Sequence, residues 1–466
     1  MKRIFIWNAH WHSVGGGEIY ALTLAKSLLE SGNYVELGSL GAFPHKKLKE
    51  VFGLTFPINQ IIEIDSENEL PSFLSGFDLF INASFGSHFS VTGINSIYIC
   101  HFPSKLPIRK KLANTINSLG KGKIFAYSNS RLLYAVNEET QYTFEGIQLF
   151  ADKKVTYSMA IDGFKLTGAK NDDKPARTTK VFELPEHQPK FINKKMAPRQ
   201  SIIISGLPKL SLRTFIINSI FSRRTYLDEY FDIWVHSNFV NGYVKKYWYR
   251  DAFTISPPVK ISNKPGLKTR NPYGIVSVGR FFDPRNGHSK NQLLLVRAFS
   301  SLAKISDKPW KLHLVGTSTD TEKPYLEKIR SEIGNLDVEI HENASLETLL
   351  DLYQTNSFYW HAAGVGQKKT HPINFEHFGI TIVEAMNNGL IPLVYEMGGP
   401  AEVLEAFQDL IYSDIVNLPS KTVHLLKSDI ENLRSRLYSE SLSYSAKNFA
   451  IHALERIRLL GDEVAD

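Results

Sequence analysis

The sequence predicts an α/β protein that contains two doubly wound domains, each a parallel sheet with helices on both faces. Strand-like and helix-like segments alternate over residues 3–40 and again over residues 274–361. Such alternation is typical of parallel sheets, because each parallel strand needs a crossover segment, usually a helix, to reach the next strand. Residues 264–273 are rich in proline, glycine and lysine and are the best candidate for a linker between the two domains.

The composition is that of a globular protein. The 466 residues can form two or three domains with their own cores, and 43% hydrophobic with 22% charged residues does not suggest disorder. Cys100 is the only cysteine, which rules out a disulfide within the chain and fits a reducing compartment such as the cytoplasm. The N-terminus is too briefly apolar for a signal peptide, and no apolar run predicts a transmembrane helix. The net charge of +7 is compatible with nucleotide-sugars, anionic lipids or nucleic acid as partners.

A glycine loop precedes the first predicted helix. Gly15, Gly16 and Gly17 follow a short apolar strand at residues 3–7, and Glu18 begins the helix. Glycines there let backbone N–H groups approach a ligand, and the helix start favours an anion. The loop is not the dinucleotide-binding fingerprint, because the third glycine comes too early. Taken alone, such a run is more often a tight turn than a binding site.

His101 directly follows an apolar strand at residues 96–100. Ligands of open α/β sheets bind at the carboxyl ends of the strands, so His101 is a candidate contact. An isolated histidine in this place more often only caps its strand. The first domain is predicted to span residues 1–263, with an insertion of mixed β and loop character at about residues 137–200 whose purpose the sequence does not indicate.

Seven basic and no acidic residues lie between residues 103 and 131. Ile108, Leu112 and Ile116 share one helical face, so residues 105–123 are predicted to form a basic amphipathic helix that can lie on an anionic membrane. A helix packed on its own domain, with its lysines in water, explains the pattern equally well. The basic residues are Lys105, Arg109, Lys110, Lys111, Lys121, Lys123 and Arg131.

Two basic residues are predicted to face one crevice of the second domain, residues 264–443. Arg280 follows the strand at residues 274–279, and Lys290 stands at the start of the next helix. A guanidinium can bind phosphate as a bidentate clamp, and an ammonium can bind it as a point charge. Residues 444–466 are predicted to form a C-terminal helix.

Two carboxylates with seven residues between them, Glu376 and Glu384, lie in residues 375–402, the stretch around which we expect the site to form. Residues 381–388 are predicted to be a short helix that a glycine ends, followed by the apolar strand Ile391–Tyr395. Glu376 then lies in the loop before the helix and Glu384 lies on the helix. The unpaired N–H groups of a helix start favour phosphate, and carboxylates can bind sugar hydroxyls.

This stretch resembles the E-x7-E motif of retaining glycosyltransferases with the GT-B fold, in particular the large family 4. The resemblance rests on HFGI before the helix, EAM on it, then Gly389, Pro392 and the GGPAE turn. The GG-x-E loop, the HFP segment, the PPV segment and GRFF…HSKNQ also match that family. The resemblance covers most of the chain except the insertion. It implies two Rossmann-like domains that face each other across a cleft, with the C-terminal helix crossing back to the first domain.

For function, the resemblance implies a retaining, metal-independent hexosyltransferase that needs no cofactor and moves a sugar from a nucleotide-diphosphate donor to an acceptor hydroxyl. The acceptor would be a glycan or a lipid-linked molecule in bacterial cell-surface polysaccharide, glycolipid or lipid-linked glycan synthesis, at the cytoplasmic face of the membrane or in the cytoplasm. Glu376 would contact the donor sugar and Glu384 the ribose. Arg280 and Lys290 would hold the pyrophosphate, and His101 would contact the sugar or the acceptor. The other implied donor-binding residues are Gly16, Gly17, Glu18, His377, Phe378, Gly379, Ile380 and Thr381.

Other functions compete with this one. A nucleotide-sugar epimerase or a phosphorylase would use the same fold, but no pyridoxal-binding segment supports a phosphorylase. A non-catalytic carbohydrate-binding scaffold is less favoured, because Arg280, Lys290, Glu376 and Glu384 occur together. A nucleic-acid-binding protein rests on net charge alone, and we expect no nucleic-acid partner.

Overall fold

The structure is a computed structural model, and its larger part is built on two parallel sheets with their helices. The larger of its two compact units consists of Met1–Ser87, Gly93–Ser104 and Asp232–Leu454 and contains both sheets. The smaller unit contains the strands between residues 125 and 168. The domain bounds at residues 263 and 443 and the linker at residues 264–273 remain predictions from the sequence. The structure describes residues 1–53, 55–89, 91, 93–105, 125–128, 131–134, 140–144, 147–151, 155–160, 163–168, 226–248, 250–261 and 269–462.

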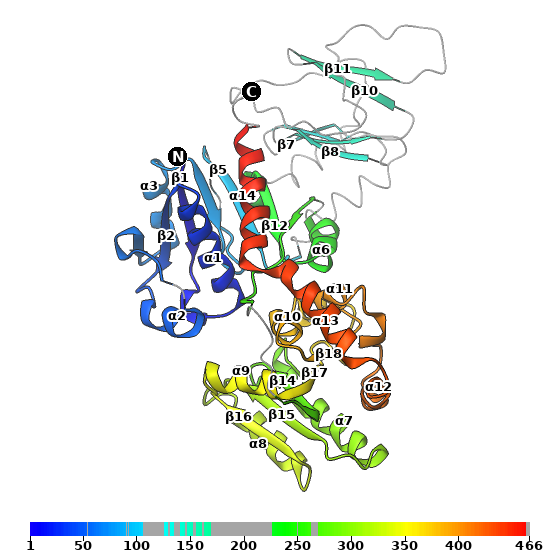
Figure 1. The fold of residues 1–466 in the computed structure, drawn as a ribbon. Coiled ribbons are helices and arrows are strands. Elements are labelled where there is room, and N and C mark those ends of the chain that lie inside the picture. The colour runs from blue at the N-terminus through cyan, green and yellow to red at the C-terminus, as the bar shows by residue number, and fades with distance from the viewer. Residues whose placement is uncertain are drawn as a thin grey trace. The chain divides into compact units, whose positions relative to one another are not determined.

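The first sheet has seven parallel strands in the order β13-β12-β5-β4-β1-β2-β3 (Figure 1). Residues Ile4 to Trp7 of the inner strand β1 are fully buried, as expected of a parallel strand covered on both faces. Its strands are β1 (Arg3–Asn8), β2 (Tyr34–Leu40), β3 (Ile61–Ile64), β4 (Leu79–Asn82), β5 (Asn95–Cys100), β12 (Asp232–Val235) and β13 (Phe253–Thr254). Its helices are α1 (Gly16–Glu30), α2 (His45–Phe52), α3 (Leu70–Leu74) and α6 (Asn238–Trp248).

The second sheet has six parallel strands in the order β16-β15-β14-β17-β18-β19. Its strands are β14 (Asn271–Val278), β15 (Lys311–Gly316), β16 (Val338–Glu342), β17 (Asn356–His361), β18 (Ile391–Tyr395) and β19 (Ile411–Tyr412). The helices of this region are α7 (Gln292–Ile305), α8 (Lys323–Ile333), α9 (Leu346–Thr355), α10 (Ile380–Asn387), α11 (Gly399–Val403), α12 (Leu418–Leu425) and α13 (Ile430–Ser441). The alternation of strands and helices predicted for residues 274–361 is therefore confirmed.

The last described helix is α14 (Ala446–Asp462), and its first turns pack against α1 beside the first sheet. Phe449 packs edge-on against Tyr20 of α1, with ring centroids 4.8 Å apart. Just before the helix, Ser445 forms a β-bridge with Val259. The chain thus returns to the first sheet after completing the second.

The smaller unit contains two antiparallel sheets, one with the strand order β7-β6-β9-β8 and one formed by β10 and β11. These strands are β6 (Phe125–Ser128), β7 (Arg131–Tyr134), β8 (Thr140–Phe144), β9 (Ile147–Ala151), β10 (Val155–Ala160) and β11 (Gly163–Gly168). They begin ahead of residue 137, where the insertion was predicted to start. Residues 106–124, which include most of the predicted basic helix, and residues 169–225 lie outside the described residues.

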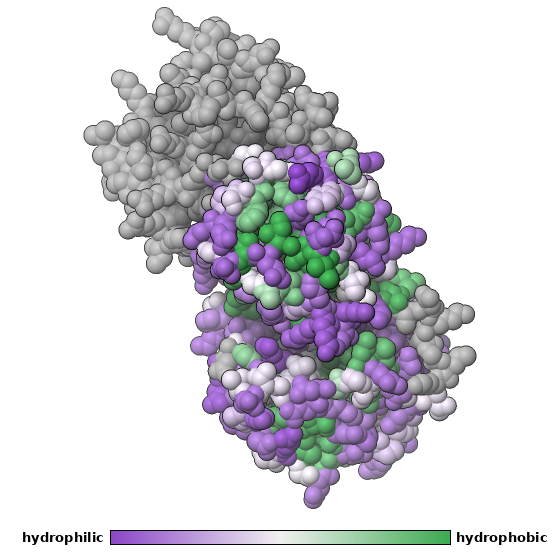
Figure 2. Space-filling view, turned by 90° about the vertical axis from the view of Figure 1, so that its left-hand side faces the viewer, coloured by the Kyte–Doolittle hydropathy of each residue, from purple (hydrophilic) through white to green (hydrophobic). Residues whose placement is uncertain are grey.

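The surface near α2 is partly apolar. Figure 2 looks onto the side that carries α2 and α3 in Figure 1 and shows hydrophobic residues grouped among hydrophilic ones. A cavity of about 410 Å³ lies beside α2. Its lining includes Leu22, Phe43, Leu48, Phe56 and Ile58. In the part of the chain that the structure describes, no helix combines the length and the hydropathy that a membrane span requires.

Candidate functional site

The centre of the site is a contact between Lys290 and Glu376. Lys290 stands just before α7, and the preceding strand β14 leads into Gly279, whose φ is 157°. A Cβ atom at position 279 would lie 2.3 Å from Cγ of Lys290. Only glycine therefore lets the lysine side chain cross the end of β14 and reach the glutamate.

Two histidines complete the surroundings of Glu376. Oε2 of Glu376 lies 3.2 Å from Nε2 of His361, which ends β17, and 3.5 Å from Nε2 of His288. Burial works to raise the pKa of Glu376, but Lys290 and then His288 act against it and hold the pKa well below its usual range. Glu376 is thus an ionised carboxylate in a cationic environment. Burial lowers the pKa of His361, so this ring is neutral at physiological pH.

The backbone that carries Glu376 is fixed by the glycine turn at the start of α11. Gly399 N donates to Glu376 O at 2.9 Å. A Cβ atom at Gly398 would lie 2.4 Å from Glu376 O, and one at Gly399 would lie 2.4 Å from His377 O. This close approach explains why two glycines follow β18, and it connects the turn to the position of the carboxylate.

The start of α10 directly follows this loop. Gly379 is the N-cap and has a φ of 102°, a left-handed conformation that favours glycine. The helix begins at Ile380, one residue earlier than predicted. Thr381 accepts a hydrogen bond of 2.7 Å from Tyr359 of β17, which ties the first turn to the sheet. The first N–H groups of α10 lack partners within the helix, so this end suits an anion.

Glu384 lies one turn further along α10. Its Oε2 accepts a 3.4 Å hydrogen bond from the Tyr353 hydroxyl. Burial raises the pKa of Glu384 to about 7. The two glutamates therefore differ in charge at neutral pH, because Glu376 has cations beside it and Glu384 has only a phenol as the partner that lowers its pKa.

His101 lies in a second group of side chains, at the carboxyl ends of β5 and β12. Its Nδ1 lies 2.9 Å from Nε2 of His236, and its Nε2 lies 3.1 Å from Ala83 O. Burial lowers the pKa of both rings. A Cβ atom at Gly17 would lie 2.7 Å from Cε1 of His101, so the glycine makes room for the imidazole.

Several contacts join this group to the loop before α10. Phe102 stacks on His377 with ring centroids 4.7 Å apart, and Ser237 Oγ donates to His377 O at 2.5 Å. A Cβ atom at Gly16 would lie 3.0 Å from Cδ1 of Ile380, so the starts of α1 and α10 lie close together. Burial lowers the pKa of His377 to about 3, and its Nε2 lies 3.1 Å from Ile373 O.

Three predicted site residues have roles within the protein itself. Both oxygens of Glu18 are used locally, because Oε2 accepts from Gly15 N at 2.8 Å and Oε1 from Asn8 at 3.2 Å. Phe378 is buried in the core and packs edge-on against Tyr444, with centroids 5.4 Å apart. Arg280 lies 3.8 Å from Glu322 and is 60% exposed, so the structure brings Lys290, but not Arg280, to Glu376.

Four residues of the site are not among those predicted from the sequence, namely His361, His236, His288 and Tyr353. A signal existed for the first two, because His361 ends the buried strand β17 and His236 directly follows the buried strand β12. His101 carries the same signal, because it also directly follows a strand. His288 and Tyr353 had no such signal, since one lies in a loop and the other has the helical spacing of a core residue.

Comparison with known proteins relates this region to glycosyltransferases. Residues 260–432 match the family model described as "Glycosyl transferases group 1". Over 190 residues the chain is 27% identical to the GDP-Man:Man(3)GlcNAc(2)-PP-Dol alpha-1,2-mannosyltransferase of Dictyostelium discoideum. This match covers 38% of the chain and 36% of that relative, so the chain spans little more than a third of the relative's length.

Two solved structures resemble the chain over nearly its whole length. A glycosyltransferase from Rickettsia africae ESF-5 has 13% identity, a TM-score of 0.56 and 98% coverage of both chains. Anabaena Alr3699/HepE in complex with UDP and glucose has 12% identity, a TM-score of 0.53, and coverage of 98% of this chain and 100% of that chain. At this identity the likeness shows the fold. The predicted fold class, two Rossmann-like domains of the GT-B type, is confirmed.

Proposed function

We propose that this protein is a glycosyltransferase that moves a sugar from a nucleotide-diphosphate donor to an acceptor hydroxyl. The observation that carries the proposal is the ionised Glu376 held against Lys290 in the loop before α10. Such a site offers a carboxylate for sugar hydroxyls beside an ammonium and a helix start for phosphate. The family match over residues 260–432 and a structural neighbour that binds UDP and glucose support the same chemistry.

The proposed reaction breaks the bond between the sugar's anomeric carbon and the phosphate oxygen and forms a bond from that carbon to the acceptor oxygen. The developing charge on the leaving diphosphate would be stabilised by Lys290, Arg280 and the N–H groups at the start of α10, without a metal ion. The acceptor's proton would pass to the departing phosphate, which lies on the face that the acceptor attacks. This same-face substitution retains the anomeric configuration, as the resemblance to family 4 implies.

The acceptor is proposed to be a glycan or a lipid-linked molecule. The Dictyostelium relative is a mannosyltransferase whose name specifies a PP-Dol acceptor, and this supports the lipid-linked choice. The basic residues between positions 105 and 123 would then hold the protein at an anionic membrane surface. Glu376 would contact the donor sugar, and His101 would face the acceptor or the sugar.

A thermal-shift panel of UDP-, GDP-, ADP- and dTDP-sugars tests the proposal. One nucleotide-sugar is expected to raise the unfolding temperature, since a ligand at 100 times its Kd stabilises the folded state by about 2.7 kcal/mol. The bare sugars serve as a control and are expected to have no effect. No stabilisation by any nucleotide-sugar would favour the carbohydrate-binding scaffold. Product analysis with the stabilising donor then separates transfer to an acceptor from epimerisation of the donor itself.

Donor binding is expected to tighten with rising pH because of Glu384. We propose that its carboxylate accepts hydrogen bonds from the ribose hydroxyls, which requires the charged form. With a pKa of about 7 in the free protein, most molecules are protonated at pH 6 and ionised at pH 8. The apparent Kd for the donor should therefore fall about tenfold over this range, because only the ionised fraction binds.

Isothermal titration calorimetry with the stabilising nucleotide-sugar measures the apparent Kd at each pH. The phosphates of a nucleotide-sugar do not titrate between pH 6 and 8, so a change in Kd over this range comes from the protein. Glu384→Gln should bind weakly and without pH dependence. Glu347→Gln, at an exposed position, is the matched control and should keep the wild-type profile. A pH dependence that survives in Glu384→Gln would contradict the assignment.

A further inference from the structure

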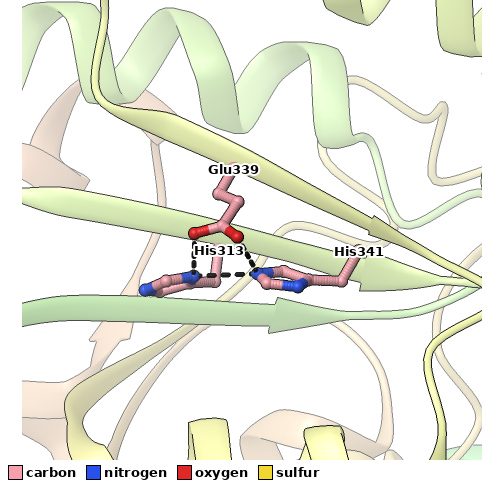
Figure 3. Close-up of side chains that lie close together, drawn as sticks. All are labelled: His313, Glu339 and His341. Atoms are coloured by element: carbon pink, nitrogen blue, oxygen red, sulfur yellow. Dashed lines mark hydrogen bonds and ion pairs between the residues drawn. The ribbon is translucent and has the colours of Figure 1, made fainter.

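Three ligand-type side chains lie together on one face of the second sheet, at its edge. His313 lies on β15, and Glu339 and His341 lie on the edge strand β16. The strands are parallel with His313 opposite Glu339, and residues two apart on a strand point to the same side. Figure 3 shows the carboxylate placed across the gap between the two rings. None of these residues belongs to the site around Glu376.

The three groups lie close enough together to share one ion, since one ligand atom from each lies within 4.8 Å of the others. Nδ1 of His313 lies 3.0 Å from Nε2 of His341. Oε2 of Glu339 lies 3.6 Å from Nδ1 of His313, and Oε1 lies 3.7 Å from Nε2 of His341. Ligands that share one ion at about 2.0–2.1 Å are separated by distances of this size. The ligand atoms need to move little to bind a common ion.

A proton shared by two of these three groups cannot also bind the third, whereas a metal ion can be bound by all three. Each imidazole nitrogen has one in-plane position, which holds either an N–H or a lone pair. Nδ1 of His313 and Nε2 of His341 face each other and the carboxylate at the same time. A hydrogen bond between the rings leaves the carboxylate without a donor from either ring. A cation placed among the three atoms would be bound by both lone pairs and the carboxylate together.

The site is sheltered at one ring and open to water at the carboxylate. The ring of His313 is 7% exposed. Lys311 is the competing cation, with Nζ 3.1 Å from Oε2 of Glu339. Its side chain is 35% exposed, so it can turn into solvent when an ion binds. Glu339 is 48% exposed and leaves a path to the site from water.

We propose that His313, Glu339 and His341 form a binding site for a divalent transition-metal ion, with Zn²⁺ as the best fit. Two imidazole nitrogens and one carboxylate oxygen are ligands that Zn²⁺ accepts, and water can fill the fourth position of its tetrahedron. Mg²⁺ and Ca²⁺ prefer oxygen ligands and are expected to bind poorly here. The ion would connect the edge strand β16 to β15 and so stabilise that edge of the sheet.

The test uses the full chain stripped of metal with a chelator and titrated with ZnCl₂ by calorimetry. The wild-type protein is expected to bind one Zn²⁺ per chain at this site, and MgCl₂ should give no binding heat. His341→Gln and Glu339→Gln should each weaken that site by roughly 100-fold or more, since even the loss of a partner outside the coordination sphere costs about 10–100-fold. His452→Gln is the matched control, because it removes an exposed histidine on α14.

Two further measurements distinguish the loss of a metal ligand from the loss of the folded structure. Circular dichroism checks that the variants are folded, and Glu339→Gln decides the matter if His341→Gln does not fold, because the glutamate is half-exposed. Co²⁺ in place of Zn²⁺ should give a visible absorption band in the wild-type protein and in His452→Gln, but not in Glu339→Gln. Wild-type Zn²⁺ affinity in Glu339→Gln and His341→Gln, or no Zn²⁺ binding by the wild-type protein, would overturn the proposal.

Discussion

Lys290→Ala is expected to lower kcat/KM for sugar transfer by about 10²–10³-fold, which corresponds to about 2.7–4 kcal/mol of transition-state stabilisation. The variant removes the ammonium that contacts Glu376 and that would meet the leaving diphosphate. The charge of Lys290 is the largest of the effects that lower the pKa of Glu376, and it acts against burial, which raises that pKa. Its loss should therefore raise the pKa of Glu376 as well as remove a charge from the site.

The measurement is steady-state transfer with the donor that the thermal-shift panel identifies. Lys290→Arg should recover part of the activity, because it keeps the charge but not the point geometry of the ammonium. Lys328→Ala is the control: this exposed lysine lies on α8, 4.0 Å from Asp283, and its removal should leave kcat/KM unchanged. Wild-type kcat/KM in Lys290→Ala would sink the assignment of Lys290 to the diphosphate.

Arg270→Ala is expected to lower the free energy of unfolding by about 3 kcal/mol or more, because it leaves buried carbonyls without donors. Nη1 of Arg270 donates to Tyr353 O at 2.8 Å and to Asn356 O at 2.7 Å, and Nη2 donates to Asn388 O. One side chain thus joins the ends of α9 and α10 to the start of β17. Burial lowers the pKa of Arg270 to about 10, so the guanidinium stays charged at neutral pH.

Equilibrium urea unfolding followed by tryptophan fluorescence measures this loss. Arg297→Ala is the matched control, since Arg297 is 55% exposed and pairs with Glu332 at 2.9 Å on the surface. Exposed ion pairs of this kind contribute about 0–1 kcal/mol. Equal stability of the two variants would show that the hydrogen bonds of Arg270 do not stabilise the fold.

Local sequence patterns were enough to place the main elements of the candidate site. The short helix with Glu384, the strand Ile391–Tyr395 and the position of Lys290 before a helix were predicted from periodicity and from the glycines that end elements, and the structure confirms them. The crevice was predicted for Lys290 together with Arg280, and the structure instead brings Lys290 to Glu376.

Contacts between distant segments could not be predicted in this way. Nothing local shows that His361 and His288 both reach Glu376, since the fold alone brings these three loops together. Nor does a GG-x-E pattern reveal that both oxygens of Glu18 are occupied by Gly15 and Asn8. Phe378 was selected by its place in a motif, whereas its ring packs in the core against Tyr444. The donor-binding roles of these residues stay predictions.

The glycines around the candidate site set a limit on how this protein can evolve. Gly17, Gly279, Gly398 and Gly399 each border a functional group or its backbone at a distance that a methyl group would violate. Every codon change that replaces one of them adds at least a Cβ atom where none fits. At these four positions the constraint is therefore one of volume, whatever the charge or polarity of the side chain that replaces the glycine.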